Sequence, residues 1–259
     1  MKYYNEYDFY TAVAKGHVRG HRMMSAMGEF ESGNVAVAGE DVCRHEDVGG
    51  PVQLPQPVPA GEQLVVISTS AEDGVAGDGV ITLRLEYLDA SGVEQTEDII
   101  MKGQTAVDTI ATNIRFVNDM YALSVGATGV AEGHITCYKK TGAVATHLYQ
   151  FIVAGGNKSL VPHRMVPLGH SLFLKGWHAE EAGIKRCLFR LRSTDMNGEL
   201  IPGVFCFKDT AMLNQSTTGE RPLMQKIPAL SVVKVSYWAI AINAEGSCGW
   251  WGLLVKDGF

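Results

Sequence analysis

The side chains best suited to chemistry near the N-terminus are histidine and cysteine. The stretch GHVRGH places His17 and His21 four residues apart, and Cys43 and His45 follow. On a helix, two histidines at this spacing share a face, as a metal site requires. A glycine precedes each histidine and weakens a helix, and no carboxylate lies between them as it does in HExxH. We therefore expect exposed or interface histidines and no metal.

Acidic residues form a second candidate site in the loop EDGVAGDG, where Glu72, Asp73 and Asp78 lie among glycines. A calcium loop would need D-x-D-x-D-G spacing and a final bidentate Glu, and both are missing. As a connection between strands the loop needs no ion. The sequence therefore predicts no calcium site, and more generally no cofactor.

The sequence contains few motifs that are typical of catalytic sites. The glycine turns GATG and AGGN do not join a strand to a helix, as a phosphate-binding loop would, and no GxSxG occurs. Glu180 and Glu181 are adjacent, so on a strand they would point to opposite faces and could not flank one bond. Carboxylates distant in sequence could still converge in the fold. We expect a protein that is not an enzyme.

Tryptophans offer a different chemistry in CGWWGLLV. On a strand, one of Trp250 and Trp251 would face the core and the other outward. The outward indole could be an interface anchor or a platform for stacking a sugar, or a neighbouring loop could cover it. The pair Tyr237–Trp238 leaves the same alternatives open.

The five cysteines, Cys43, Cys137, Cys187, Cys206 and Cys248, are widely spaced and contain no CxxC pair. The contexts of Cys137, Cys187 and Cys206 are apolar and strand-like, which is typical of buried free thiols in a reducing cytoplasm. A disulfide between chains remains an alternative, with Cys43 and Cys248 as its best candidates because loops surround them.

Composition bounds the class of protein that must position these groups. The chain has 259 residues, a net charge of −6, 46% hydrophobic residues and 19% charged residues. An acidic chain is not a general nucleic-acid coat, and no apolar run approaches the roughly 18 residues of a membrane helix. The N-terminus also has no hydrophobic region typical of a secretory signal. We expect no nucleic-acid or membrane partner.

After Pro59 the pattern is one β-strand after another, separated by glycine turns. In TLRLEYL, Leu83, Leu85 and Tyr87 alternate with Arg84 and Glu86, as in a sheet with one wet face. Long amphipathic helices are absent from the pattern. The sequence predicts an all-β fold.

Two halves of this region match each other. PAGEQLVV from Pro59 matches PLGHSLFL from Pro167, and Leu83-Arg84-Leu85 with its D-x-x-G turn matches Phe189-Arg190-Leu191. The turn at 131–133 matches that at 244–246, and Asn113-Ile114 lies opposite Lys226-Ile227. The matches predict two tandem jelly-roll-like β-sandwich modules, at 59–155 and 162–259, joined by a hinge at 156–161.

Residues 1–58 differ from the rest and predict an extended N-terminal arm that docks on another surface. The segment is aromatic at its start, glycine-rich later, and closes on the proline run PVQLPQPVP. The alternative is an N-terminal strand or short helix packed on its own domain. The predicted contacts with a partner are Tyr3, Tyr4, Tyr7, Phe9, Tyr10, Arg19, Arg22, Trp250 and Trp251.

The succession of motifs after residue 35 resembles structural proteins of tailed bacteriophages. The motifs are Tyr87-Leu88-Asp89 with Gly92, Gly103-Gln104-Thr105 with Val107, Gly133-His134-Ile135, Pro167-Leu168-Gly169 with Trp177, and Lys226-Ile227-Pro228-Ala229-Leu230. Each motif alone is weak, and their order carries the resemblance.

The resemblance implies a virion component without enzymatic activity, most like a capsid decoration (cement) protein. Such proteins are similar β-sandwich modules that sit as trimers on the capsid lattice. The implied partners are the major capsid protein and two further copies of this chain in a homotrimer. The implied location is the outer surface of a virion head that assembles in the bacterial cytoplasm. Alternatives are a low-copy tail, collar or adaptor component, and a carbohydrate-binding adhesin.

Overall fold

The computed structural model describes residues 6–31, 43–45, 50–52, 60–141, 148–182, 186–214, 218, 220–239 and 245–259. Within this part the fold is all-β with several small antiparallel sheets and one short helix, which confirms the predicted class. No helix here is long and apolar enough to span a bilayer. The elements of the first half are α1 (Glu6–Ala14), β1 (His21–Glu31), β2 (Cys43–His45), β3 (Gly50–Val52), β4 (Leu64–Ser68), β5 (Val80–Asp89), β6 (Glu94–Ile100), β7 (Val107–Asp108), β8 (Ile114–Val125), β9 (Ile135–Lys139) and β10 (Leu148–Ile152).

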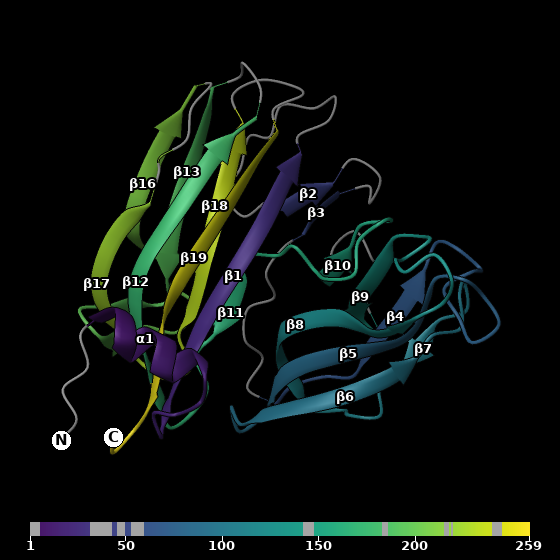
Figure 1. The fold of residues 1–259 in the computed structure, drawn as a ribbon, viewed down its shortest axis with the longest axis horizontal. Helices are drawn as coiled ribbons and strands as arrows, with labels where there is room; N and C mark the ends of the chain where they lie inside the picture. Colours follow the sequence, from purple (N-terminus) through teal and green to yellow (C-terminus); the bar gives the residue numbers. More distant parts are fainter. Residues whose placement is uncertain are drawn as a thin grey trace.

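The remaining strands follow β10 and fill the body on the left of Figure 1. They are β11 (His163–Met165), β12 (His170–Glu181), β13 (Cys187–Ser193), β14 (Asp195–Met196), β15 (Glu199–Leu200), β16 (Cys206–Leu213), β17 (Arg221–Ile227), β18 (Val232–Ala239) and β19 (Glu245–Lys256).

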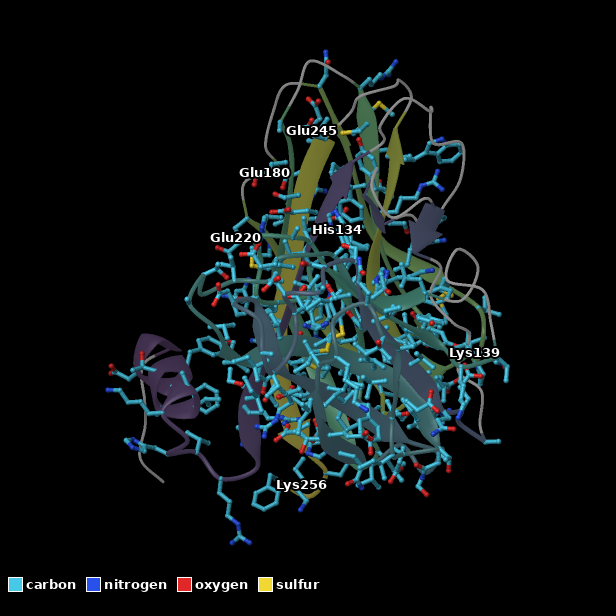
Figure 2. All side chains as sticks on the ribbon, turned by 90° about the vertical axis from the view of Figure 1, so that its right-hand side faces the viewer. His134, Lys139, Glu180, Glu220, Glu245 and Lys256 are labelled. Atoms are coloured by element: carbon cyan, nitrogen blue, oxygen red, sulfur yellow. The ribbon has the colours of Figure 1, made fainter. Side chains whose placement is uncertain are left out.

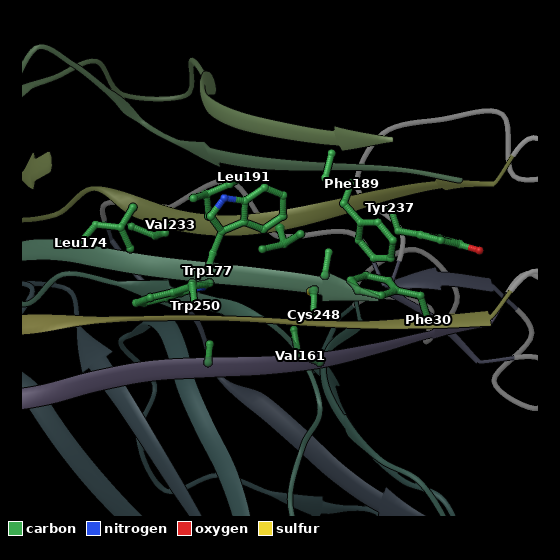
Figure 3. Close-up of a cluster of buried hydrophobic side chains, with 14 of the residues drawn as sticks. Phe30, Val161, Leu174, Trp177, Phe189, Leu191, Val233, Tyr237, Cys248 and Trp250 are labelled. Atoms are coloured by element: carbon green, nitrogen blue, oxygen red, sulfur yellow. The ribbon is translucent and has the colours of Figure 1, made fainter. Parts of the chain in front are cut away.

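We use the name C-terminal module for the sheets β1-β19-β12-β17 and β11-β18-β13-β16. One apolar cluster takes side chains from both sheets, and large rings fill it (Figure 3). Trp177 and Phe189 are fully buried there, and Trp250 and Tyr237 are 1% exposed. β19 runs the length of this module, from Glu245 at one end to Lys256 at the other (Figure 2).

We use the name N-terminal module for the sheets β10-β9-β4-β7 and β6-β5-β8, which enclose a second apolar cluster. The alternation predicted on β5 is confirmed. Leu83 and Leu85 are fully buried, while Arg84 on the other face forms a bidentate pair with Asp98, at 2.7 and 2.8 Å. A period of two therefore identified both the strand and its inward face.

The two modules share a strand plan. In the first, β4 pairs with β7 and β9, and β5 pairs with β6 and β8. In the second, β12 pairs with β17 and β19, and β13 pairs with β16 and β18. The matched segments 64–66 and 172–174, and likewise 83–85 and 189–191, therefore lie in equivalent strands. The third match includes residue 244, which lies outside the described part. The fourth is wrong, because Asn113-Ile114 leads into β8 whereas Lys226-Ile227 ends β17.

Glycines at equivalent turns support the same plan. Gly61 and Gly169 both have positive φ, at 66° and 74°, and so do Gly92 and Gly198, at 80° and 84°. A side chain is strained in this region of φ, so the turns need glycine. At Gly61 a Cβ would also lie 2.3 Å from the backbone of Asn113.

The described part of the predicted arm lies within the C-terminal module. β1 pairs with β19 along its whole length, from His21–Val255 to Glu31–Glu245, and it takes the place that β10 has in the N-terminal module. Ala26 and Phe30 enter the core. For residues 6–31 the structure therefore corresponds to the alternative of a helix and strand packed on their own domain. Residues 1–5, 32–42, 46–49 and 53–58 lie outside the described part.

Buried contacts join the two modules. All of β10 is buried; Leu148 and Phe151 belong to the C-terminal cluster, and Tyr149 and Ile152 to the N-terminal one. Backbone hydrogen bonds fix the predicted hinge to its neighbours. The Ala122 amide donates to the carbonyl of residue 157 at 2.8 Å. Along the same segment, the Ser159 amide donates to the Met120 carbonyl at 2.8 Å, and the Glu29 amide to the Leu160 carbonyl at 3.3 Å.

Candidate functional site: a surface beside α1 and a groove between the modules

The predicted contact residues fall in several places. Tyr3 and Tyr4 lie outside the described residues, and Tyr7 belongs to α1, with a side chain that is not described. Phe9 is half-buried and packs with Val13 against the β19 residues Leu253 and Val255. Phe9 thus holds α1 on the sheet, and only part of it is open to a partner.

Tyr10 and Trp251 do meet. Their rings make an edge contact, with centroids 6.1 Å apart. Lys175 Nζ lies 5.5 Å from the centre of the Tyr10 ring and 3.5 Å from Met224 Sδ. We add Phe173, which lies two residues before Lys175 on β12, and use the name α1 surface for the set Tyr10, Phe173, Lys175, Met224 and Trp251.

Trp250 and Trp251 face opposite ways, as expected for neighbours on a strand. Trp250 is 1% exposed in the core, and its indole N–H donates to the Pro162 carbonyl at 3.1 Å, so it offers no surface to a partner. The Trp251 N–H donates to Glu220 at 3.0 Å, and Tyr10 covers one edge of its ring. A residue of α1, rather than a loop, therefore covers Trp251 in part.

Two predicted arginines lie apart from this patch. The Arg19 guanidinium is 5.4 Å from the centre of the Phe259 ring. Arg22, at the start of β1, forms an ion pair with Glu94 of β6 and so links the two modules. Arg22 thus belongs to the junction of the modules.

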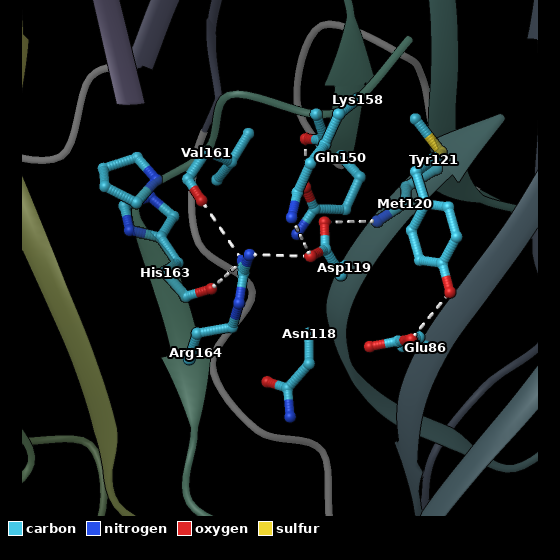
Figure 4. A network of polar contacts seen from close by, with 12 residues as sticks. Glu86, Asn118, Asp119, Met120, Tyr121, Gln150, Lys158, Val161, His163 and Arg164 are labelled. Carbon is cyan, nitrogen blue, oxygen red and sulfur yellow. Dashed lines mark hydrogen bonds and ion pairs between the residues drawn. The ribbon is translucent and has the colours of Figure 1, made fainter. Parts of the chain in front are cut away.

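A buried ion pair crosses this junction (Figure 4). Arg164 of β11 is 5% exposed and donates to Asp119 of β8 at 3.1 Å, and Lys158 reaches the same carboxylate at 2.8 Å. Burial lowers the pKa of Arg164 from its usual value. Asn118 donates to the Met165 carbonyl at 3.1 Å and accepts from the Met165 amide at 2.8 Å, which fixes β8 against β11.

A groove of about 460 Å³ opens beside this network. Among the described residues its charged lining consists of Arg22, Glu86, Glu94, Asp119, Lys158 and Arg164. Of these six residues the sequence predicted only Arg22 as a contact residue, because the others come from separate strands and from the hinge at 156–161. The one sequence signal was a cation in an apolar stretch, Arg164 in LVPHRMV.

The acidic loop has a structural task. Asp73 is fully buried and accepts hydrogen bonds from the amides of Val80 at 2.8 Å, Glu132 at 3.0 Å and Gly133 at 2.9 Å. The Ser68 hydroxyl donates to it as well. These donors occupy the carboxylate that a calcium ion would need.

Metal and thiol chemistry have little support in the described residues. No group of three or more His, Cys, Asp or Glu side chains within these ranges could hold a metal ion. Cys137 and Cys187 are buried free thiols, Cys248 is buried, and Cys206 is half-buried. Burial raises the pKa of Cys187 to about 12. Because Cys248 is fully buried, it is a poor candidate for a disulfide between chains; the side chain of Cys43 lies outside the described part.

Comparison with known proteins gives little guidance. No family model matches the chain, and no curated protein does. The solved structure of infectious bursal disease virus, Gx strain, aligns at 8% identity over 92% of this chain and 72% of that one, with a TM-score of 0.26. The Gt strain aligns at 10% identity over 93% and 73%, with a TM-score of 0.23. Values this low do not show a shared fold.

Proposed function

We propose that the protein is a structural component of a virion, and specifically a decoration protein that binds and stabilises the assembled head of a tailed bacteriophage. The motif succession from Tyr87 to Leu230 supports the class. The α1 surface carries the binding role. Met224 is 79% exposed and Phe173 37% exposed. Apolar groups collected on one face of a protein mark a surface that meets another protein.

The two halves of the chain differ in their balance of acidic and basic residues. Residues 59–155 contain twelve acidic and five basic residues, whereas residues 162–259 contain eight acidic and eleven basic ones. The α1 surface, with Lys175, lies on the less acidic side. We infer that this side meets the shell and that the acidic module points outward.

The remaining features of the proposal follow from the resemblance. Each pair of sheets forms a jelly-roll-like sandwich, and copies of the chain associate as a trimer on the lattice of the major capsid protein. The location is the outer surface of the head, and no enzymatic activity or cofactor is involved. Because such a protein binds only the assembled lattice, mass action over many sites opposes disassembly.

The binding role is tested with purified heads that lack the protein. Met224→Asp and Phe173→Asp place a charge in the apolar patch, so we expect occupancy to fall by about tenfold or more, equivalent to about 1.4 kcal/mol of binding. Ile110→Asp is the matched control, since Ile110 is 87% exposed in the N-terminal module. Equal occupancy for all three variants would contradict docking through the α1 surface.

The place in the virion is tested by copy number, from quantitative mass spectrometry of purified particles against the major capsid protein. A number comparable to the capsid subunit supports decoration. A small fixed number replaces it with a tail, collar or adaptor role, and absence from the particle leaves the adhesin as the alternative.

A further inference from the structure

The groove between the modules has a balanced charge. Its described lining contains three cations and three carboxylates, and each carboxylate already has a partner. Arg22 pairs with Glu94, and Lys158 and Arg164 share Asp119. The third carboxylate, Glu86, accepts a hydrogen bond from the Tyr121 hydroxyl at 2.9 Å.

This pairing selects the kind of ligand. An ion entering the groove gains little net attraction, because it meets opposite charges side by side and must displace one of them. A hydroxyl group can instead donate to a carboxylate and accept from a neighbouring guanidinium or ammonium at once. The groove is therefore suited to a neutral ligand that carries many hydroxyl groups.

Other lining groups fit the same ligand. Ser25, Gln95, Thr96 and Asn118 add neutral donors and acceptors, while Met23, Met24 and Tyr87 add apolar surface. A sugar ring presents both kinds of surface, with hydroxyls at its rim and C–H groups on its faces. The volume of about 460 Å³ lies within the usual range of small-molecule sites.

The site is also held in place before a ligand arrives. Asp119, Arg164 and Asn118 are each less than 10% exposed and are fixed by contacts across the junction (Figure 4). Groups held in this way lose little freedom on binding. We propose that the groove between the modules binds a neutral oligosaccharide. The proposal does not depend on docking to a head.

The test measures binding of maltotetraose, cellotetraose and tetra-N-acetylchitotetraose to the full chain by saturation-transfer NMR and titration. We expect at least one of them to bind with a Kd of about 1 mM or tighter, and the anionic probe tetragalacturonate to bind at least about tenfold more weakly. Absence of binding by all three neutral sugars would overturn the proposal, and so would tighter binding of the anion.

Three variants locate the binding. Thr96→Trp fills the groove and should weaken binding by about tenfold or more, whereas Thr105→Trp, on an exposed turn away from the groove, should leave it unchanged. If Thr96→Trp does not fold, Gln95→Leu replaces it in the test. This variant removes an amide at similar volume and should also weaken binding. Full binding by a folded Thr96→Trp variant would show that the sugar binds elsewhere. Occupancy on heads should not change with Thr96→Trp, which separates this site from the α1 surface.

Discussion

Single buried polar side chains organise the loops and junctions of this molecule. Asp73 gathers three backbone amides and one hydroxyl from separate segments. His163, at the module junction, is 1% exposed beside Lys234, its partner in the β11–β18 register. Asp73 and His163 are both buried. Replacing Asp73 or protonating His163 should therefore lower the free energy of unfolding more than the same change at an exposed residue.

Replacement of Asp73 by alanine should lower the free energy of unfolding by about 3 kcal/mol, since its buried donors lose a charged acceptor. Asp78→Ala is the control, because Asp78 is exposed in the same loop and should change stability by less than about 0.5 kcal/mol. Urea denaturation followed by circular dichroism measures both. Similar stability of the two variants would contradict the role of Asp73.

His163 should make stability depend on pH. Burial, with Lys234 and Arg164 nearby, holds the pKa of His163 well below 6.5. The unfolded chain therefore binds the proton more readily, and stability falls as pH decreases below about 6.5, by up to about 1.4 kcal/mol per pH unit. His163→Gln should show a shallower loss between pH 7.5 and 5.5 in thermal denaturation. Parallel curves for the two proteins would refute this.

At the scale of elements, β1 is the main departure from the sequence prediction. In its sequence HRMMSAMGEF, methionine and glycine interrupt the alternation of apolar and polar residues that identifies a strand. Its partner β19 lies more than 200 residues away. Nothing local in the sequence points to that pairing. By contrast, a strand such as β5 was predictable, because alternation and glycine turns are local signals.

Phe30→Ala should show that β1 is part of the core. Phe30 is 2% exposed and stacks on Tyr237 with ring centroids 5.1 Å apart, so we expect a loss of about 3–5 kcal/mol. Met27→Ala, on the outer face of the same strand at 59% exposure, should change stability by less than about 0.5 kcal/mol. An undocked arm would give no difference between the two melting curves.

At the scale of the molecule, the modules are joined by polar and apolar contacts together. A small apolar cluster, with Leu88 and Phe116 from one module and Met165 and Val232 from the other, lies at the same junction as the Asp119 ion pairs. The sequence predicted the all-β class but not this junction, because its groups come from strands distant in sequence. The groove could not be predicted for the same reason.

Asp119→Ala should therefore uncouple the modules. It leaves Arg164 buried without its carboxylate, at a cost of about 3–5 kcal/mol. We expect calorimetry to resolve two unfolding transitions where the parent protein shows one. Asp98→Ala removes an exposed pair with Arg84 instead and should cost no more than about 1 kcal/mol. A single transition in the Asp119 variant would contradict the coupling.

The pairing of β1 with β19 also bears on how the protein is made. During synthesis β1 leaves the ribosome more than 200 residues before its partner β19, so β1 must wait while the intervening chain emerges. The N-terminal module has all its paired strands well before then and can fold while translation continues. Closure of the C-terminal module has to wait until β19 has emerged, and pairing over so long a sequence separation is slow.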